Sequence, residues 1–515
     1  MSSTESSPIA ARICELVQAQ SGQAALVFQD TEERTCHSPQ AMWDMIERIT
    51  SRLQAAGIQR GDRLAWLSLN HIAQLAALVA CARIGAIWVP LNFRLAVPEL
   101  QQVIADAQPK LLVADHAHES VAQALSGDIP HQLSIAGLLD ADARSNEATR
   151  AETISALSGE ANDPVLLVYT SGTTGRPKGA LHTQQALMNN AAASHWAHGF
   201  KPDDCVLSTL PMFHVGGLCI QTLPAWLAGA SVILHARFDP ALWLKEVETS
   251  RPTLSLLVPA TLRAVIEHPA WDKTDLSALR GLMTGSSVVP RAYLEAFHQR
   301  GVPVGQVYGT TETGPVSIVL RFHEAMTHVG STGQPQPNAK LKLLDEQGTP
   351  VAHGTVGEIT IHADNLMSGY WNASAQTGVG LEDGWFRSGD LGMVDRDGRL
   401  TIVGRNKDMI ISGGENIYPA EVENLMVTLP GVAECAVVGL PDARWGEVPV
   451  LSVVRTTDPP GQQLQASDIQ DHLSAQVARY KLPKKIVFLD TLPKSALGKV
   501  LKPQLRELLL AREWR

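Results

Sequence analysis

Residues 169–179 read YTSGTTGRPKG and open on the last residue of an apolar run, 165–169 (VLLVY). A short β-branched and aromatic run of this kind predicts a strand, and the glycines and hydroxyls after it place a loop at the strand's end. Glycines adopt backbone angles closed to other residues, so successive N–H groups can point at one anion. The hydroxyls and cations add donors and positive charge. The stretch therefore predicts a loop that binds a triphosphate.

The candidate phosphate-binding residues of this loop are Thr170, Ser171, Gly172, Thr173, Thr174, Gly175 and Lys178. A polar, glycine-rich surface turn is the plainer alternative, but hydroxyls, glycines and a lysine rarely coincide in this way without an anion. The spacing is not that of the G-x-x-x-x-G-K-[ST] loop, because Arg-Pro-Lys-Gly follows Gly175 and no Ser or Thr follows the lysine. A GTPase-like or kinase-like switch is therefore not indicated.

Composition restricts the class of protein. The chain has 515 residues, more than one core usually supports, so two or more domains are expected. It is 45% hydrophobic and 18% charged, as folded globular proteins are, and its formal charge of -10 argues against nucleic acid as a partner. The cysteines lack C-x-x-C spacing, which predicts reduced, buried thiols and a cytoplasmic location. No signal peptide is read at the N-terminus, and no transmembrane segment is predicted.

The pattern of apolar runs predicts an α/β fold. Strand-like runs such as 110–114 alternate with helical segments such as 240–250 over most of the chain, which indicates parallel sheets covered by helices. Beyond about residue 330 short strands and turns predict antiparallel hairpins and a small β-barrel-like subdomain. The polar stretch 404–408 is the expected domain boundary. We therefore expect a large domain over 1–404 and a small α+β domain over 405–515.

Further stretches carry candidate functional side chains. Glu312, in 306–314 (QVYGTTETG), offers oxygen ligands for the magnesium that accompanies ATP, and Thr311 beside it offers a donor to a phosphate. Asp390, in 385–392 (WFRSGDLG), suits a pair of ribose hydroxyls. His214, in 210–217 (LPMFHVGG), and Lys499, in 492–501 (LPKSALGKVL), are candidates whose plainer alternatives are a core histidine and a surface lysine. The alternatives for Glu312 and Asp390 are a capped turn and a turn aspartate.

Taken together and in chain order, these stretches resemble the acyl-adenylate-forming superfamily, which includes acyl-CoA synthetases, adenylation domains of peptide synthetases and firefly-type luciferases. The resemblance spans roughly residues 60 to 505. It implies that Lys499 bridges the substrate carboxylate and the α-phosphate of ATP, and that His214 borders the acyl pocket. It also implies an ATP- and AMP-binding set around the adenine and ribose: Gly285, Ser286, Tyr308, Gly309, Thr310, Asp390 and Arg405.

The same resemblance implies a reaction in two halves. The carboxylate first attacks the α-phosphorus of ATP and releases pyrophosphate, and a thiol then displaces AMP. No side-chain nucleophile is required, so positioning and cations would do the work. Lys407 occupies the position of the family's hinge, about which the small domain rotates between the halves. Gly413 and Gly414, in 409–417, would then line the tunnel for the thiol of coenzyme A, where side chains do not fit. ATP, Mg²⁺ and coenzyme A are thus the expected cofactors.

Within the superfamily an acyl-CoA synthetase is favoured, because the chain stops soon after Lys499 and leaves no room for a fused carrier domain. A stand-alone adenylation enzyme that loads a carrier protein, a luciferase-like oxidation and a nucleotide-binding regulator remain open, although the last would require loss of Lys499 or Glu312. Apolar residues near His214 suggest a fatty or an aryl or arylpropenoic acid. A short dicarboxylate would need a buried cation, for which Arg237 and Arg263 are the candidates. A homodimeric state is left open by the sequence.

Overall fold

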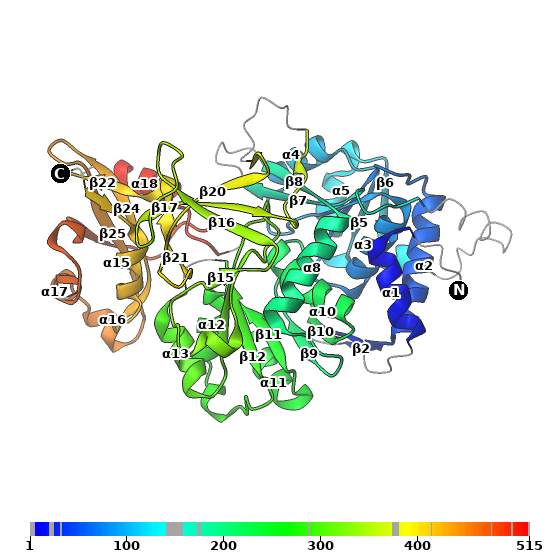
Figure 1. The fold of residues 1–515 in the computed structure, drawn as a ribbon, viewed down its shortest axis with the longest axis horizontal. Coiled ribbons are helices and arrows are strands. Elements are labelled where there is room, and N and C mark those ends of the chain that lie inside the picture. Colours follow the sequence, from blue (N-terminus) through cyan, green and yellow to red (C-terminus); the bar gives the residue numbers. More distant parts are fainter. Residues whose placement is uncertain are drawn as a thin grey trace.

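The computed structural model describes residues 6–19, 25–30, 33–140, 158–171, 177–286, 289–372, 381–413, 415–474, 476–495 and 498–512. Figure 1 shows a large N-terminal body, coloured blue through green to yellow, and a smaller C-terminal unit, coloured orange to red, at one end of it. The sheets and helices confirm the expected α/β fold class.

The first sheet presents the predicted phosphate loop. Its parallel core contains β3 (Arg63–Leu67), β4 (Ile87–Pro90) and β5 (Leu111–Ala114). β7 (Pro164–Ser171) adds parallel to β4, and β8 (Pro177–Thr183) returns antiparallel to β7. The two strands β7 and β8 therefore enclose the glycine-rich loop between them.

The second sheet has nine strands, in the order β15-β14-β13-β12-β11-β9-β10-β1-β2. Its central parallel strands are β9 (Cys205–Ser208), β10 (Ser231–His235), β11 (Leu254–Leu257), β12 (Gly281–Gly285) and β13 (Val304–Tyr308). Because the carboxyl ends of parallel strands meet at one edge, the segments that follow these strands gather there.

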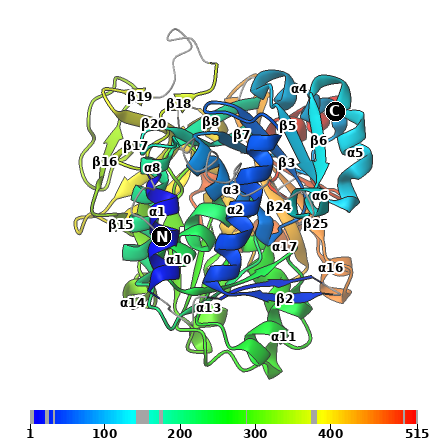
Figure 2. The same ribbon diagram turned by 90° about the vertical axis from the view of Figure 1, so that its right-hand side faces the viewer.

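One large apolar core joins the two sheets. α3 (Ile72–Ile84) is buried along its entire length, and it packs in a cluster that includes Trp66 and Trp88 from the first sheet and Val206 from the second. A helix that is apolar on all sides is stable only in such surroundings. Figure 2 looks onto α1 (Pro8–Gln18) and α2 (Pro39–Ala55), which cover this core from outside.

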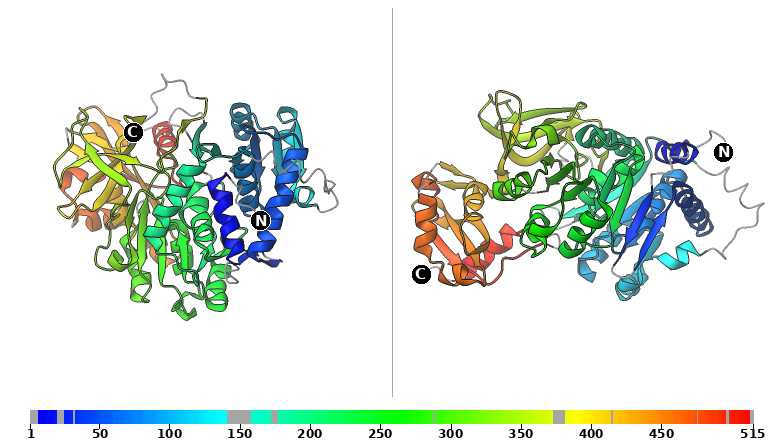
Figure 3. Two further views of the ribbon diagram at one scale, coloured as in Figure 1. Left: turned by 45° about the vertical axis from the view of Figure 1, so that its right-hand side comes forward. Right: turned by 90° about the horizontal axis from the view of Figure 1, so that it is seen from below.

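Antiparallel strands follow, as the sequence predicts. β17 (Val356–Ala363) pairs with β16 (Ala339–Leu344) and with β20 (Trp385–Val394), and β20 pairs in turn with β21 (Leu400–Arg405). The C-terminal unit then has its own core around β24 (Val432–Asp442) and β25 (Gly446–Arg455). The right-hand view of Figure 3 shows this unit as a separate body.

Two further expectations concern the surface and the membrane. All six cysteines are free, and Cys81 and Cys219 are buried, but Cys36 is exposed. The expectation of uniformly buried thiols is thus wrong for Cys36, because β2 (Arg34–His37) lies at the edge of its sheet with this residue on an open face. In the described part of the chain no helix is both long and apolar enough to cross a membrane.

Candidate active site

The hairpin of β7 and β8 places Thr170 opposite Lys178 and Tyr169 opposite Gly179. The Thr170 hydroxyl donates to the Lys178 carbonyl at 3.4 Å. A Cβ on Gly179 would lie 2.7 Å from Leu167 Cδ1, so this position accepts only glycine without rearrangement. The predicted residues Gly172, Thr173, Thr174 and Gly175, and the side chain of Ser171, lie outside the described residues.

The turn after β13 carries Glu312. The backbone N–H of Thr310 donates to Thr313 Oγ1 at 2.9 Å, and Gly314 closes the turn at a φ of 59°. A Cβ on Gly309 would lie 2.6 Å from the Pro315 backbone, which explains a glycine at the start of the turn. Thr311 is buried. The Glu312 carboxylate accepts a hydrogen bond of 2.6 Å from the Tyr370 hydroxyl.

Tyr370 is a residue of this site that the motif reasoning missed. It lies in β18 (Gly369–Tyr370), which adds to the edge of the first sheet beside β8. Its ring centroid is 5.4 Å from Lys178 Nζ, so the same side chain contacts the predicted phosphate loop and the predicted metal ligand. The only local signal is an aromatic pair after a glycine, Gly369-Tyr370-Trp371, which is a weak one.

Asp390 lies in β20 between two predicted partners. Its Oδ2 accepts from the Tyr308 hydroxyl at 2.9 Å, and its Oδ1 pairs with Arg405 Nε at 3.1 Å, across the register of β20 and β21. Burial and the Asp390 charge raise the pKa of Tyr308, so the phenol stays a neutral donor. The structure thus brings together a tyrosine, a carboxylate and a guanidinium from three separate strands.

The end of β12 supplies the predicted adenine edge. A Cβ on Gly285 would lie 2.4 Å from the Val307 carbonyl oxygen of the neighbouring strand, so glycine permits the close approach. Ser286 has a φ of 76°, in the left-handed region that non-glycine residues rarely occupy. Backbone strain of this kind is often found at ligand sites.

His214 caps the short helix α9 (Val215–Gly217), where its Nδ1 accepts from the Gly216 N–H at 3.0 Å. Burial, with a smaller contribution from the charge of Lys499, lowers the pKa of His214 to about 4, so the imidazole is neutral at physiological pH. A Cβ on Gly217 would lie 2.2 Å from the Pro211 carbonyl oxygen.

A turn of π-helix, η3 (Leu218–Thr222), continues from α9. The carbonyl groups that this wide turn frees are satisfied by side chains: the Thr222 hydroxyl donates to Gly217, and the Asn190 amide donates to Cys219 at 2.7 Å. Such turns inside helices are rare and frequent at functional sites.

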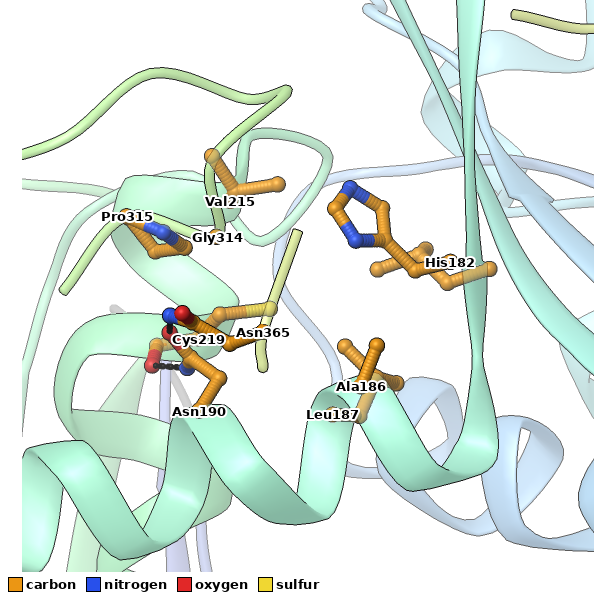
Figure 4. A pocket seen from close by; sticks show the side chains of 10 residues that line it. His182, Ala186, Leu187, Asn190, Val215, Cys219, Gly314, Pro315 and Asn365 are labelled. Carbon is orange, nitrogen blue, oxygen red and sulfur yellow. Dashed lines mark hydrogen bonds between the residues drawn. The ribbon is translucent and has the colours of Figure 1, made fainter. Parts of the chain in front are cut away.

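Figure 4 shows how closely these segments pack. His182 of β8, Val215 and Cys219 of the α9–η3 segment, and Gly314 after Glu312 surround a gap with no room for a water molecule. Burial lowers the pKa of His182 to about 4, so the ring is neutral there. The β7–β8 hairpin, the Glu312 turn and the His214 segment are therefore parts of one packed unit.

Lys499 reaches this unit from the C-terminal end of the chain. Burial and the charge of Arg405, against the opposing charge of Asp390, lower its pKa to about 8. Lys499 is exposed as a whole residue, and its ammonium interacts with the charges of Arg405 and Asp390. The structure therefore brings together Lys499, His214, Asp390 and Arg405.

The predicted hinge and tunnel residues come soon after Arg405 in the chain. Lys407 is exposed in the 3₁₀ turn η5 (Asn406–Asp408), directly after β21. Gly413 has a φ of 61°, and a Cβ there would lie 2.6 Å from the ring of Trp445. Trp445 is 40% exposed, and Lys484 Nζ lies 5.9 Å from its ring centroid. Gly414 lies outside the described residues.

Neither arginine named for a dicarboxylate pocket is a free buried cation. Arg237 is exposed. Arg263, in α12 (Pro259–Ile266), pairs with Glu267 at 2.7 Å and donates to the carbonyl of Ala433 in the C-terminal unit.

Comparison with known proteins finds the same enzyme family over both parts of the chain. Residues 15–371 match the family described as AMP-binding enzyme, and residues 421–499 match its C-terminal domain. The chain is 44% identical over 474 residues to an indoleacetate–CoA ligase of Aromatoleum aromaticum, covering 90% of this chain and 92% of the relative. It is 41% identical over 461 residues to a feruloyl-CoA synthase of Amycolatopsis, covering 90% and 91%.

Among solved structures, an o-succinylbenzoate coenzyme A synthetase of Bacillus subtilis in complex with ATP and magnesium matches with a TM-score of 0.85 and 28% identity. The match covers 96% of this chain and 98% of that one.

Proposed function

The chain belongs to the family of AMP-binding enzymes and is an acid–thiol ligase, and we propose that its acid substrate is an aryl or arylpropenoic acid. The reaction activates a carboxylic acid with ATP, releases pyrophosphate, and transfers the acyl group from AMP to coenzyme A. The observation that carries the substrate proposal is the similarity, above 40% identity across 90% of the chain, to two ligases named for acids with an aromatic ring.

The residues next to His214 favour an acid that carries no charge apart from the reacting carboxylate. Ile220 packs with Leu256, Met283 and Val316 in an apolar cluster next to the His214 segment. A distal carboxylate buried here without a cation would be costly. Arg263 is engaged by Glu267 and Arg237 is exposed, which disfavours a short dicarboxylate. A long-chain fatty acid is the second candidate, because a mycobacterial long-chain fatty-acid–CoA ligase is 34% identical over 469 residues.

In the proposed first half-reaction the chain's own groups act by position and charge. Asp390, held by Tyr308 and Arg405, accepts from the ribose hydroxyls and fixes the nucleotide. The hairpin that carries Lys178 holds the departing phosphates. Lys499 donates to the substrate carboxylate and to the α-phosphate as negative charge develops between them. The neutral His214 borders the carboxylate without adding a competing charge.

Magnesium fits the donor set. Magnesium is usually held by one or two carboxylates together with phosphate oxygens and waters. Glu312 offers a carboxylate with only one oxygen bound by Tyr370, and the described residues contain no group of three or more acidic, histidine or cysteine side chains that would suit a protein-only metal cage. When bound, the ion would neutralise phosphate charge, and Glu312 would be its protein ligand.

In the proposed second half-reaction the C-terminal domain, over 405–515, rotates about Lys407 relative to the domain over 1–404. The rotation withdraws Lys499 and presents the Gly413 hairpin as one wall of a thiol tunnel. Exposed Trp445 and the nearby Lys484 support coenzyme A as the acceptor, because its nucleotide offers an aromatic base and phosphates. We also place the enzyme in the cytoplasm, where free cysteines such as those of this chain stay reduced.

A pyrophosphate-release screen tests the proposal. The panel contains an arylacetate, an arylpropenoate, a long-chain fatty acid and a short dicarboxylate, each with and without coenzyme A. We expect the two aromatic acids to give the highest kcat/KM and to form thioesters. A preference for the fatty acid would replace the proposed substrate class, and turnover that requires a carrier protein in place of coenzyme A would overturn the acceptor.

A further inference from the structure

Tyr370 connects two parts of the site that the sequence keeps far apart. We propose that Tyr370 is a positioning residue of the metal-dependent step: its hydroxyl orients Glu312 toward the metal, and its ring steadies Lys178 at the phosphates. The inference rests on the proposed function and deepens it, because it assigns a role to a side chain that no motif named.

The hydroxyl contact fixes the Glu312 carboxylate. The Tyr370 O–H is the only donor of the pair, because an ionised carboxylate can only accept, and the 2.6 Å distance is typical of a charge-assisted bond. One oxygen, Oε1, is thereby held, and no residue in the described part of the chain donates a hydrogen bond to Oε2.

The ring contact extends the same role to Lys178. Lys178 Nζ lies 5.4 Å from the ring centroid, within the range of a cation–π interaction. Lys178 precedes Ala180 on β8, and Ala180 is the register partner of Tyr370 across the β8–β18 pair. Neighbouring strands therefore hold the ring and the ammonium in a fixed relation.

Hydrogen bonds of the residues before and after β18 hold this strand in place. The Trp371 N–H donates to the Gly179 carbonyl at 2.7 Å, and the Trp371 indole donates to the Asp106 carbonyl at 3.2 Å. In addition, the Met367 N–H donates to the Glu312 carbonyl at 2.8 Å. The backbone around Tyr370 is thus fixed by its neighbours, so removal of the hydroxyl alone should leave the strand in place.

The test separates the two contacts. Tyr370→Phe removes the hydroxyl and keeps the ring, whereas Tyr370→Leu removes both. Binding of a non-hydrolysable ATP analogue is measured by calorimetry with Mg²⁺ and with the metal chelated. We expect Tyr370→Phe to bind about 10- to 100-fold more weakly with Mg²⁺, as loss of a residue that orients a metal ligand typically does, and to match the unmodified protein without metal. Tyr370→Leu should weaken metal-free binding as well.

Tyr169→Phe is the matched control, because the Tyr169 hydroxyl makes a similar bond of 2.5 Å to a different carboxylate, Asp106. It should leave the metal dependence unchanged. Glu312→Gln combined with Tyr370→Phe should bind no worse than Glu312→Gln alone. Circular dichroism and thermal unfolding check that each variant is folded.

Two results would overturn the inference: Tyr370→Phe that binds normally with Mg²⁺, or one that loses the same factor with and without metal. If Tyr370→Leu behaves as Tyr370→Phe, the part assigned to Lys178 is wrong. A different result would contradict the proposed substrate and leave this inference standing. In that case no acid gives pyrophosphate release, but metal-dependent binding still responds to Tyr370→Phe.

Discussion

Lys499 provides the sharpest test of the site, because it should act in one half-reaction only. Lys499→Ala removes an ammonium of the C-terminal unit whose charge acts on His214 and Asp390. Loss of a single donor to charge that develops in a transition state typically costs about 10²- to 10³-fold in rate. Pyrophosphate release should fall by that factor. Thioester formation from supplied acyl-AMP should remain within about threefold of the unmodified enzyme, since the proposed domain rotation has withdrawn Lys499 before that step.

The unmodified enzyme should show the same dependence through pH. Burial, with a contribution from Arg405, lowers the pKa of Lys499 to about 8. A cation with a lowered pKa loses its proton as pH rises through that value, so about nine-tenths of the enzyme carries the charge at pH 7 and about one-tenth at pH 9. The kcat/KM for adenylation should therefore fall roughly tenfold between pH 7 and pH 9. The thioester half-reaction should not follow this titration at Lys499.

The assay follows pyrophosphate in the first half-reaction and coenzyme A thioester in the second, with acyl-AMP supplied. Lys494→Ala is the matched control: Lys494 lies in the same C-terminal segment, but it pairs with Glu434 at 2.5 Å. Equal losses in both half-reactions for Lys499→Ala would refute the assigned role. So would an adenylation profile that stays flat to pH 9, or a Lys494→Ala variant with the same defect.

Three further outcomes are expected. Gly413→Val should spare pyrophosphate release and reduce thioester formation at least tenfold, because the position has a φ of 61° and a Cβ would lie 2.6 Å from a neighbouring ring; a defect in adenylation alone would contradict the tunnel. Tyr308→Phe should weaken AMP binding about tenfold or more in calorimetry, since the hydrogen bond of 2.9 Å to Asp390 involves a charged group. An unchanged affinity would contradict the proposal that Asp390 binds the ribose. Arg280→Met should lower the free energy of unfolding by about 2–4 kcal/mol in urea, because it leaves the buried Asp204 carboxylate without its ion pair. The lowered pKa of Asp204 contributes stability that is present above its usual pKa and is lost on acidification. The difference in free energy of unfolding between Arg280→Met and the unmodified protein should therefore shrink below about pH 4.

Much of the fold could be predicted from local patterns. The helix predicted over 240–250 is α11 (Pro240–Ser250), and the predicted strand over 110–114 is β5. The helix opens with an aspartate cap and a proline, and the strand is a continuous apolar run, which are features that short-range rules detect. The strand predicted over 165–169 is longer, because β7 continues through Ser171 in register with β8. That extension depends on a partner strand, which local periodicity does not report.

The site divides in the same way. The sequence by itself determined the chemical inventory: a loop of glycines and hydroxyls after a strand, and Glu312, Asp390 and Lys499 as the groups with chemistry to perform. These assignments depend on residue types and on spacing along the chain. Only the tertiary structure decided which groups meet. It set Tyr308 and Arg405 on either side of Asp390, lowered the pKa of Lys499, and placed Tyr370 between Glu312 and Lys178. Each of these effects depends on the distance between charged or polar groups and on how far they are buried. Strands far apart in sequence set both quantities only when they pair and pack.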